Sequence, residues 1–262
     1  MDLGLQLSFF KYQGTGNDFI IIDNRLEIFP KNNTKLVAFL CNRKFGIGAD
    51  GLILLESDTM SDFKMVYYNA DGHQSTMCGN GGRCIVAFAR KLGIINDSTQ
   101  FSAVDGLHSA HIANGLVTLY MNEVDEIRSK PKYHFLNTGS PHHVQLMEEL
   151  DGMDVKLEGA KLRYGLYGQE GSNINFVQKV DNDTFKVRTY ERGVEDETLS
   201  CGTGVTAVAI AMHHYGNTSA EQIHIETIGG PLTVSFQKKG DTYTNVTLTG
   251  PAEFVFKGEI AC

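Results

Sequence analysis

Two cysteines, each at the start of a glycine-rich segment, are the residues best suited to chemistry in this sequence. Cys78 opens the segment Cys-Gly-Asn-Gly and Cys201 opens Cys-Gly-Thr-Gly, and an apolar stretch follows each segment. This composition predicts a loop that leads directly into a helix. A helix N-terminus carries unpaired N–H groups and roughly half a positive charge. Each segment is therefore predicted to bind a small anion, such as a carboxylate, beside a cysteine of lowered pKa.

A second pair of motifs repeats at the same distance as the cysteines. Cys78 and Cys201 are 123 residues apart, and so are the turns that begin at Thr15-Gly16 and at Thr138-Gly139. Two motif pairs with one offset indicate an internal duplication. Because solenoid repeats are about 20–50 residues long, a repeat of this length predicts two copies of one domain.

Two cysteines on matching loops predict a reaction with an acid and a base. An ordinary thiol, with a pKa of about 8.5, is only a few per cent thiolate at neutral pH, so activation by the helix matters. A thiolate on one face of a carbon would remove a proton, and a thiol on the other face would return one, which inverts a stereocentre. The N–H groups of both helices would stabilise the enolate-like intermediate.

Other readings of the cysteines are weaker. A single buried cysteine most often serves packing, which is our prediction for Cys41 and Cys84. The spacing between Cys78 and Cys84 is not that of a zinc site, and Cys201 has no second thiolate nearby, so no metal is predicted. The terminal Cys262 is predicted to have no role. Residues 46–51 match a dinucleotide fingerprint but precede a strand rather than a helix, so no such cofactor is predicted.

Each polar residue near the two loops could have either a structural role or a role in the site. His142 follows the second Thr-Gly turn and is placed to tune a thiolate, although a lone histidine is often structural. Glu191 and Arg192 form either an exposed ion pair or part of the binding site, since they correspond in position to Asn69-Ala70 of the first copy.

Composition limits the class of partner. A net charge of −8 without a basic run argues against nucleic acid. The sequence contains no apolar run long enough to span a membrane and no secretory signal pattern at its start, which predicts a cytoplasmic protein with free thiols.

The predicted elements have the same order in both halves. In the first half, a strand, the Thr-Gly turn and a buried strand precede an early helix, two further strands, the cysteine loop, its helix and a set of hairpin strands. In the second half, the Thr-Gly turn precedes two strands, the cysteine loop, its helix and the closing strands. Thr34 is predicted to cap an early helix, residues 84–92 to form the first post-cysteine helix, and residues 122–132 to form a polar junction. Both post-cysteine helices are apolar on nearly all faces, which predicts that each domain wraps its sheet around a buried helix.

Taken together, the motifs resemble those of diaminopimelate epimerase over residues 9–259. The matching segments are Gly14-Thr15-Gly16-Asn17-Asp18-Phe19, Asn69-Ala70-Asp71-Gly72, Cys78-Gly79-Asn80-Gly81-Gly82-Arg83-Cys84, Glu191-Arg192-Gly193 and Cys201-Gly202-Thr203-Gly204. The resemblance implies an α+β fold of two pseudo-symmetric domains, each a mostly antiparallel sheet rolled around a central helix. The implied domains are residues 1–122 with 252–262, and residues 123–251.

The resemblance also implies an activity. It is the cofactor-independent interconversion of LL- and meso-diaminopimelate, a small-molecule substrate, in lysine and peptidoglycan precursor synthesis. The implied enzyme is a cytoplasmic homodimer. Cys78 and Cys201 resemble the catalytic pair, and His142 and Glu191 the auxiliary polar groups. The residues that resemble substrate contacts are Asn17, Asn69, Gly79, Asn80, Asn173, Glu191, Arg192, Gly202 and Thr203.

Some residues depart from the family pattern. Ser140 stands where many members have Asn, Gly51 where some have Gln, and Asp196 resembles a one-residue insertion. Two alternatives stay open from the sequence: a racemase or epimerase of another amino acid, of the proline or hydroxyproline type, and a noncatalytic amino-acid-binding protein.

Overall fold

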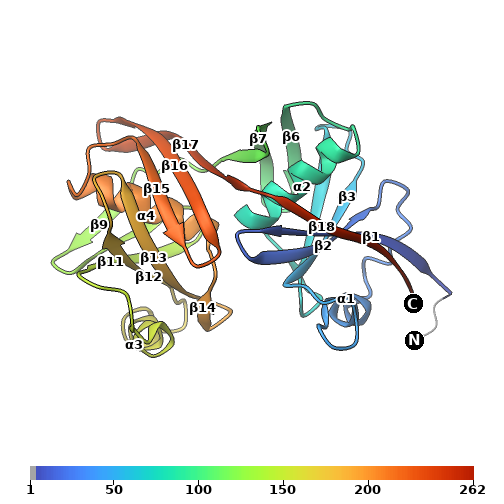
Figure 1. Ribbon diagram of the computed structural model, residues 1–262, viewed down its shortest axis with the longest axis horizontal. Helices are drawn as coiled ribbons and strands as arrows, with labels where there is room; N and C mark the ends of the chain where they lie inside the picture. Colours follow the sequence, from blue (N-terminus) through green and yellow to red (C-terminus); the bar gives the residue numbers. More distant parts are fainter. Residues whose placement is uncertain (1–3) are drawn as a thin grey trace. The chain divides into compact units, whose positions relative to one another are not determined.

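The computed structural model describes residues 4–262. The chain divides into two compact units, one formed by residues up to 119 together with 251–262 and the other by residues 120–250 (Figure 1). The described residues form four helices and eighteen strands, so the fold belongs to the α+β class, as predicted.

The first unit contains two helices and nine strands. Its helices are α1 (Thr34–Cys41) and α2 (Gly79–Lys91). Its strands are β1 (Gln6–Gly14), β2 (Asn17–Asp23), β3 (Gly51–Glu56), β4 (Phe63–Asn69), β5 (Gln74–Ser75), β6 (Ser98–Ala103), β7 (Gly106–Ala113), β8 (Leu116–Tyr120) and β18 (Glu253–Ala261).

The second unit repeats this composition. Its helices are α3 (Val155–Tyr167) and α4 (Gly202–His214). Its strands are β9 (Ile127–Lys130), β10 (Tyr133–Asn137), β11 (Pro141–Met147), β12 (Asn173–Lys179), β13 (Thr184–Glu191), β14 (Asp196–Thr198), β15 (Gln222–Thr227), β16 (Gly230–Lys239) and β17 (Thr242–Pro251).

Strand pairing follows one pattern in both units. In the first unit the neighbours run β18-β1-β2-β3-β4-β6-β7-β8, antiparallel except for the parallel pairs β2–β3 and β4–β6. In the second they run β9-β10-β11-β12-β13-β15-β16-β17, with β11–β12 and β13–β15 parallel. The parallel pairs occur at the same places in both orders. This agreement supports the duplication inferred from the two motif pairs.

Each parallel pair requires a crossover, and the crossovers contain the four helices. α1 and α3 connect β2 to β3 and β11 to β12, while α2 and α4 connect β4 to β6 and β13 to β15. The two cysteine helices therefore occupy equivalent positions in the two units.

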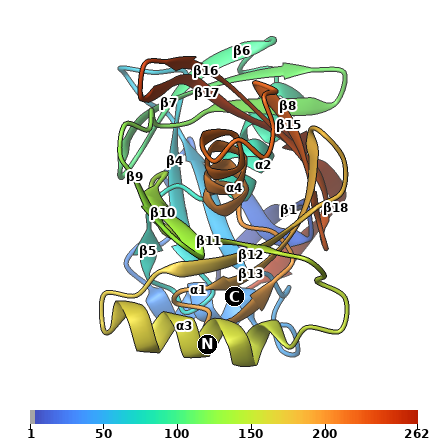
Figure 2. The same cartoon turned by 90° about the vertical axis from the view of Figure 1, so that its left-hand side faces the viewer.

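α4 forms the core of the second unit because it has no polar face. Eight of its residues in succession, Val205 to Met212, are fully buried. They pack against apolar side chains of the strands from β10 to β17, such as Val144, Val177 and Val234. Figure 2 shows α4 in the middle of the view with these strands around it. The prediction of a sheet rolled around a central helix is thus confirmed for this unit, and the burial of α2 gives the first unit the same design.

The cysteine helices begin earlier than predicted. α2 starts at Gly79 rather than at Cys84, and Cys78 is its N-cap. The prediction failed because glycines usually disfavour a helix interior. Here the first turn is closely packed: a Cβ on Gly82 would lie 2.9 Å from the sulfur of Met77 and one on Gly81 would lie 3.2 Å from Ile53, so these flexible side chains would have to move.

Other differences lie in short elements. The cap of α1 is Asn33, whose side chain accepts a hydrogen bond from the Leu36 N–H, and not Thr34. The predicted polar junction contains β9. α3 has no counterpart among the predicted elements, since only Val155, Gly159 and Arg163 of its residues are buried and its apolar pattern is weak.

The central role of α4 can be tested by truncation. Ile210 is fully buried within α4, whereas Ile228 is 54 % exposed in the turn between β15 and β16. We expect Ile210→Ala to lower the free energy of unfolding by about 2–5 kcal/mol, because it leaves a cavity in the core. The control Ile228→Ala should change it by less than about 0.5 kcal/mol. Urea unfolding followed by circular dichroism measures both, and equal losses would contradict this account of the core.

Candidate active site

Three residues of the predicted site meet at the N-terminus of α2. Cys78 has an extended backbone as the N-cap, and its side chain does not cap the helix. The sulfur lies 3.6 Å from the side-chain oxygen of Asn17, at the start of β2. The side-chain N–H₂ of Asn80 donates to the same oxygen at 3.3 Å. The first-turn glycines let the helix approach the strands, so these three side chains contact one another.

Asp50 fixes the orientation of the Asn17 side chain. The Asn17 N–H₂ group donates to Oδ2 of Asp50 at 2.6 Å, and the other oxygen of Asp50 accepts from Arg43 at 2.7 Å. The same Oδ2 atom also accepts from the backbone N–H of Asp18 at 3.2 Å, so it acts as an acceptor here. The amide nitrogen of Asn17 must therefore face Asp50, and its oxygen must face Cys78 and Asn80.

Arg83 places a positive charge inside this half of the site. Its side chain is fully buried, and burial is the main cause that lowers its pKa. The guanidinium donates to uncharged oxygens: the carbonyls of Pro251 and Gly79 and the side chains of Thr15 and Asn80. The bond to the Asn80 side-chain oxygen, at 3.0 Å, fixes the orientation of the Asn80 amide, because a guanidinium can only donate hydrogen bonds.

The second cysteine has a different neighbour. Cys201 is the N-cap of α4, again extended and again without a capping side-chain bond. Its sulfur lies 3.6 Å from the hydroxyl oxygen of Thr203. A Cβ on Gly204 would lie 2.6 Å from the Asn175 side-chain oxygen, so only glycine lets the first turn of α4 approach β12 this closely.

A buried polar network connects this hydroxyl to His142. Nε2 of His142 lies 2.9 Å from both Thr203 Oγ1 and Ser140 Oγ, and the two hydroxyl oxygens are 3.1 Å apart. On its other side, Nδ1 of His142 faces the side-chain nitrogen of Asn175 at 3.2 Å. His142 is completely buried, and this burial, together with the charge of Arg192, lowers its pKa to about 3.

The network determines which nitrogen of His142 carries the proton. The Asn175 N–H₂ group also donates to the backbone carbonyl of His143 at 2.9 Å, while its oxygen accepts from Thr189 at 3.0 Å. Its nitrogen must therefore be the atom that faces His142, so Nδ1 accepts. Neutral His142 then carries its proton on Nε2 and donates it toward Ser140 and Thr203.

The remaining predicted residues of the second unit surround this network. The Asn173 N–H₂ group donates to Ser140 at 3.1 Å, and its oxygen accepts from the backbone N–H of Arg192 at 2.9 Å. Glu191 accepts from the Thr198 hydroxyl at 2.9 Å. The Arg192 guanidinium donates to the carbonyl of Glu170, so the structure does not pair it with Glu191.

Asn69 and the two loop glycines complete the predicted set. Gly79 and Gly202 are the first residues of α2 and α4. Asn69 ends β4 and is the register partner of Gly51. Close packing explains why residue 51 is a glycine. A Cβ there would lie 2.5 Å from the ring of Tyr67 and 2.7 Å from the carbonyl oxygen of Tyr68.

The cysteines outside the loops are packing residues. Cys41 and Cys84 are buried, and burial is the main cause that raises the pKa of each thiol to about 12. Cys262, predicted to have no role, packs in a core cluster, and its backbone pairs with that of Leu5. The prediction for Cys262 was wrong because the placement of residues 252–262 in the first domain did not show that this terminal side chain is buried in its core.

Sequence reasoning missed three residues that fix the two loops. Asn175 is one of them, although it is two residues from Asn173 in a strand and so shares its face. Arg83 interrupts an apolar helix five residues after Cys78, which is a visible signal of a special role. Asp50 had no signal in the sequence, since its contact with Asn17 depends on the pairing of β2 with β3.

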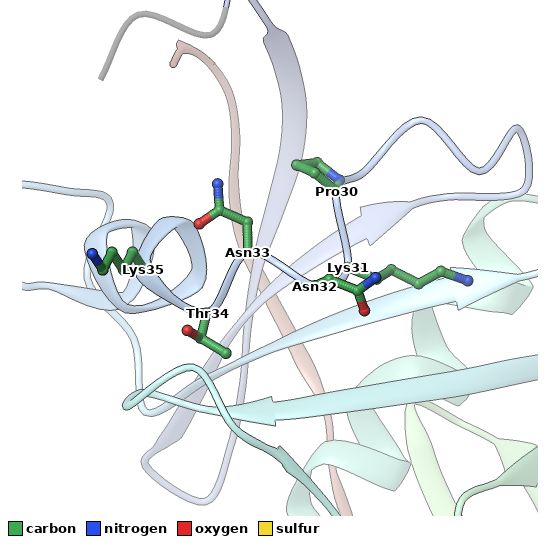
Figure 3. Close-up of a pocket in the computed structure, with 6 residues that line it drawn as sticks. All are labelled: Pro30, Lys31, Asn32, Asn33, Thr34 and Lys35. Carbon is green, nitrogen blue, oxygen red and sulfur yellow. The ribbon is translucent and has the colours of Figure 1, made fainter.

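Other hollows and clusters do not add to the site. A shallow pocket is lined by residues 30–35, where Asn33 caps α1 and Lys31 pairs with Glu56, so these polar groups already serve the fold (Figure 3). Within the described residues 4–262, no group of three or more His, Cys, Asp or Glu side chains is arranged to hold a metal ion. In the same part of the chain no helix is long and apolar enough to cross a membrane.

The fold of this chain is shared with several solved structures. A phenazine biosynthesis protein of the PhzF family from Bacillus anthracis has the same fold, with a TM-score of 0.78 and 13 % identity over 98 % of this chain and 100 % of that one. A hydroxyproline epimerase from Agrobacterium vitis has a TM-score of 0.70 and 14 % identity over 100 % of this chain and 94 % of that one. At this level of identity the likeness concerns the fold.

Sequence comparison is more specific. The model of the diaminopimelate epimerase family matches residues 9–125 and 134–255. The diaminopimelate epimerase of Flavobacterium psychrophilum is 62 % identical over 97 % of this chain and its own full length. That of Chlorobaculum tepidum is 40 % identical over 94 % of this chain and 98 % of its own. The chain belongs to the diaminopimelate epimerase family, which confirms the resemblance drawn from the motifs.

The protonation state of His142 gives a direct test of the network. Its pKa is lowered to about 3, so the imidazole should stay neutral, with the proton on Nε2, from pH 7 down to about pH 4. Nitrogen-15 chemical shifts of histidine-labelled protein report both the charge and the tautomer, and the variant His142→Gln assigns the signal. Protonation near pH 6.5, or a proton on Nδ1, would contradict the network. Because unfolded histidine binds a proton near pH 6.5, this residue should favour unfolding as the pH falls from there toward 3.

Proposed function

We propose that this chain interconverts LL- and meso-diaminopimelate without a cofactor, in the synthesis of lysine and peptidoglycan precursors. One observation carries the proposal beyond family membership. Each unit presents one cysteine as the N-cap of a buried thirteen-residue helix, at the same place in the same strand order. An enzyme that inverts a stereocentre needs two proton-transfer groups on opposite faces of one carbon, and a duplicated fold supplies two.

In the proposed reaction, Cys78 and Cys201 face the α-carbon from opposite sides. One sulfur, as a thiolate, takes the α-proton and becomes a thiol, and the electron pair of the broken C–H bond moves into an enolate-like intermediate. The other sulfur, as a thiol, gives its proton to the opposite face and becomes a thiolate. The N–H groups at the two helix N-termini bind the carboxylate and stabilise the charge that develops on it.

The surroundings of the cysteines support separate auxiliary roles. His142, neutral and linked to Thr203, orients a hydrogen bond at Cys201 and does not serve as a cation. Glu191 is the last residue of β13, and Arg192 follows it. We propose that both bind the charged groups of the substrate. Asn17, Asn80, Gly79, Gly202 and Thr203, in or beside the two cysteine loops, and Asn69 and Asn173 are the further proposed substrate contacts.

Two further properties belong to the proposal. The three consecutive residues Phe254, Val255 and Phe256 of β18 are 43 %, 54 % and 44 % exposed, which is unusual for a run of apolar side chains and supports a homodimer. All five cysteines are free thiols, and two of them are the proposed acid and base, which supports a reducing, cytoplasmic location.

The two-thiol mechanism predicts the behaviour of single cysteine variants. Incubation of the enzyme with either isomer of diaminopimelate in D₂O should place deuterium at the α-carbon. We expect both Cys78→Ala and Cys201→Ala to lower kcat for epimerisation at least about a hundredfold, because each removes an acid or base. Mass spectrometry and chiral chromatography measure exchange and inversion, with Cys84→Ala, in the core, as the matched control. Near-normal inversion by either loop variant would refute the mechanism.

The same assay separates the two alternative functions. Inversion of proline or hydroxyproline but not of diaminopimelate would indicate a racemase of another amino acid. Binding of diaminopimelate without α-proton exchange would indicate a noncatalytic binding protein.

The dimer proposal has its own test. Val255→Glu places a charge in the middle of the exposed apolar run, and we expect it to convert a dimer into a monomer. Val180→Glu is the control, because Val180 is equally exposed, at 53 %, but lies in the turn between β12 and β13. Size-exclusion chromatography with light scattering gives the mass. If the unmodified protein is a monomer, or if both variants remain dimeric, β18 is not the interface.

A further inference from the structure

The turn between β13 and β14 contains or adjoins the two charged residues that the proposed function assigns to the substrate. Glu191 ends β13, and the turn runs from Arg192 to Glu195, whose N–H donates to the carbonyl of Glu191 at 2.8 Å. The Arg192 backbone N–H donates to Asn173, whose N–H₂ group donates to Ser140 in the buried polar network of this unit. The position of the turn therefore sets where Arg192 lies relative to the second half-site.

Glu195, the last residue of this turn, has the left-handed backbone conformation that favours glycine. Its φ angle is +57°, in a region that residues with a Cβ rarely adopt. Glycine would adopt the same conformation at a lower cost in free energy, so the backbone does not explain a glutamate here. Strained positions of this kind persist where the surroundings hold them, and they cluster at functional sites. The reason for a glutamate at 195 must therefore lie in its side chain.

The Glu195 carboxylate accepts four hydrogen bonds. Oε1 accepts from the backbone N–H of Gly193 at 3.1 Å and from Nε of Arg163 at 3.3 Å. Oε2 accepts from the hydroxyls of Tyr190 at 3.0 Å and Tyr164 at 3.1 Å. A carboxylate has about four acceptor sites, so this cluster uses all of them. Burial alone would raise the pKa of this carboxyl, but the hydrogen bonds and the charge of Arg163 outweigh it and hold the pKa below its usual value.

Arg163 connects the turn to the segment that precedes β12. It lies on α3 and is buried, and its Nη1 donates to the carbonyl of Gly168 at 2.5 Å. Two residues further along the same segment, the carbonyl of Glu170 accepts from the Arg192 guanidinium at 2.8 Å. Arg163 therefore holds both neighbours of the Arg192 side chain: the turn, through Glu195, and the segment that supplies its carbonyl partner.

The β13–β14 hairpin does not need Glu195 for its attachment to the rest of the unit. Arg188 pairs with Glu197 across the two strands through two hydrogen bonds of 2.7 Å. Asp196, the residue that resembles an insertion, forms an ion pair with a lysine of α3 at 2.5 Å. These bonds hold the strands, whereas the bonds of Glu195 reach into the turn itself, to Gly193. The carboxylate at 195 therefore fixes the part of the hairpin that lies next to the proposed substrate contacts.

We infer that Glu195 is a positioning residue for substrate binding: with the buried guanidinium and the two tyrosines of its cluster, it holds the turn so that Glu191 and Arg192 meet the charged groups of the substrate. The inference rests on the proposed function, which gives Glu191 and Arg192 that role. Glu195 acts through these two residues and not on the reacting carbon. Its loss should therefore weaken substrate binding and leave proton transfer at the cysteines largely unchanged.

Steady-state kinetics with diaminopimelate test this role. Glu195→Gly removes the carboxylate and relaxes the backbone, so the variant should fold, which circular dichroism checks. We expect it to raise KM about tenfold, the size of one lost hydrogen bond to a charged group, and to change kcat by less than about twofold, the pattern of lost ground-state binding. Glu195→Gln keeps a side chain of the same length but cannot accept from all four donors, so it should raise KM in the same direction.

The neighbouring carboxylate provides the matched control. Asp196→Asn removes the exposed ion pair with Lys156, which also joins the hairpin to α3, and should change KM and kcat by less than about twofold. An unchanged KM in both Glu195 variants would overturn the inference. So would a lower kcat at unchanged KM, or an equal rise of KM in the control.

A measurement without substrate separates this inference from the proposed function. The Arg192 amide is bonded to Asn173, so its hydrogen-exchange rate, followed by NMR, reports whether the turn is held in place. We expect Glu195→Gly to speed this exchange at least about tenfold and Asp196→Asn to leave it unchanged. Unchanged exchange in Glu195→Gly would overturn the positioning role. Faster exchange in a protein that does not epimerise diaminopimelate would support the hold on the turn and contradict only the proposed function.

Discussion

The burial of one apolar helix inside each rolled sheet is the constraint on which both half-sites depend. A helix without a polar face must be covered on all sides, so its side chains cannot contribute to a site along its length. Only its ends reach other groups, and its N-terminus carries the unpaired N–H donors. Cys78 and Cys201 stand at these N-termini. The chemistry is therefore concentrated at the first turn of α2 and of α4.

That first turn must approach the strands closely, which explains its glycines. A Cβ on Gly204 would lie 2.6 Å from Asn175 of β12, and a Cβ on Gly81 would lie 3.2 Å from Ile53 of β3. The close approach also buries polar side chains of the strands, and each buried polar group needs a partner. Within residues 4–262 every buried side-chain nitrogen or oxygen has one. Such a network is rigid because the loss of one member leaves its neighbours unsatisfied.

Much of this arrangement could be predicted from the sequence, and the limits have physical reasons. The two cysteine helices, the hairpin strands and the duplication were visible because they depend on local composition and on a fixed offset. α3 was missed because it lies against the sheet with few buried residues. The contacts of Asp50 and Asn175 were missed because strand pairing creates them, and pairing register cannot be read from one strand. The resemblance to a known family named candidate site residues but not the directions of their hydrogen bonds.

The duplication has kept the backbone frame and changed the polar groups within it. Two positions after each cysteine stand Asn80 and Thr203, and five positions after stand Arg83 and Thr206. Arg83 is a buried cation, while Thr206 donates its hydroxyl to the carbonyl of Gly202 and brings no charge. The two half-sites therefore share a geometry but differ in the side chains that surround each sulfur.

This difference matters for a reaction that needs one thiol and one thiolate at the same time. Two identical, independent thiols at a pH equal to their pKa would leave only about half of the molecules with a single proton, and that proton would be on either sulfur equally. When the groups around two thiols differ, their pKa values separate and the singly protonated form becomes more abundant. Divergence between the copies is then part of the catalytic design, because perfect symmetry would divide the enzyme among four protonation states.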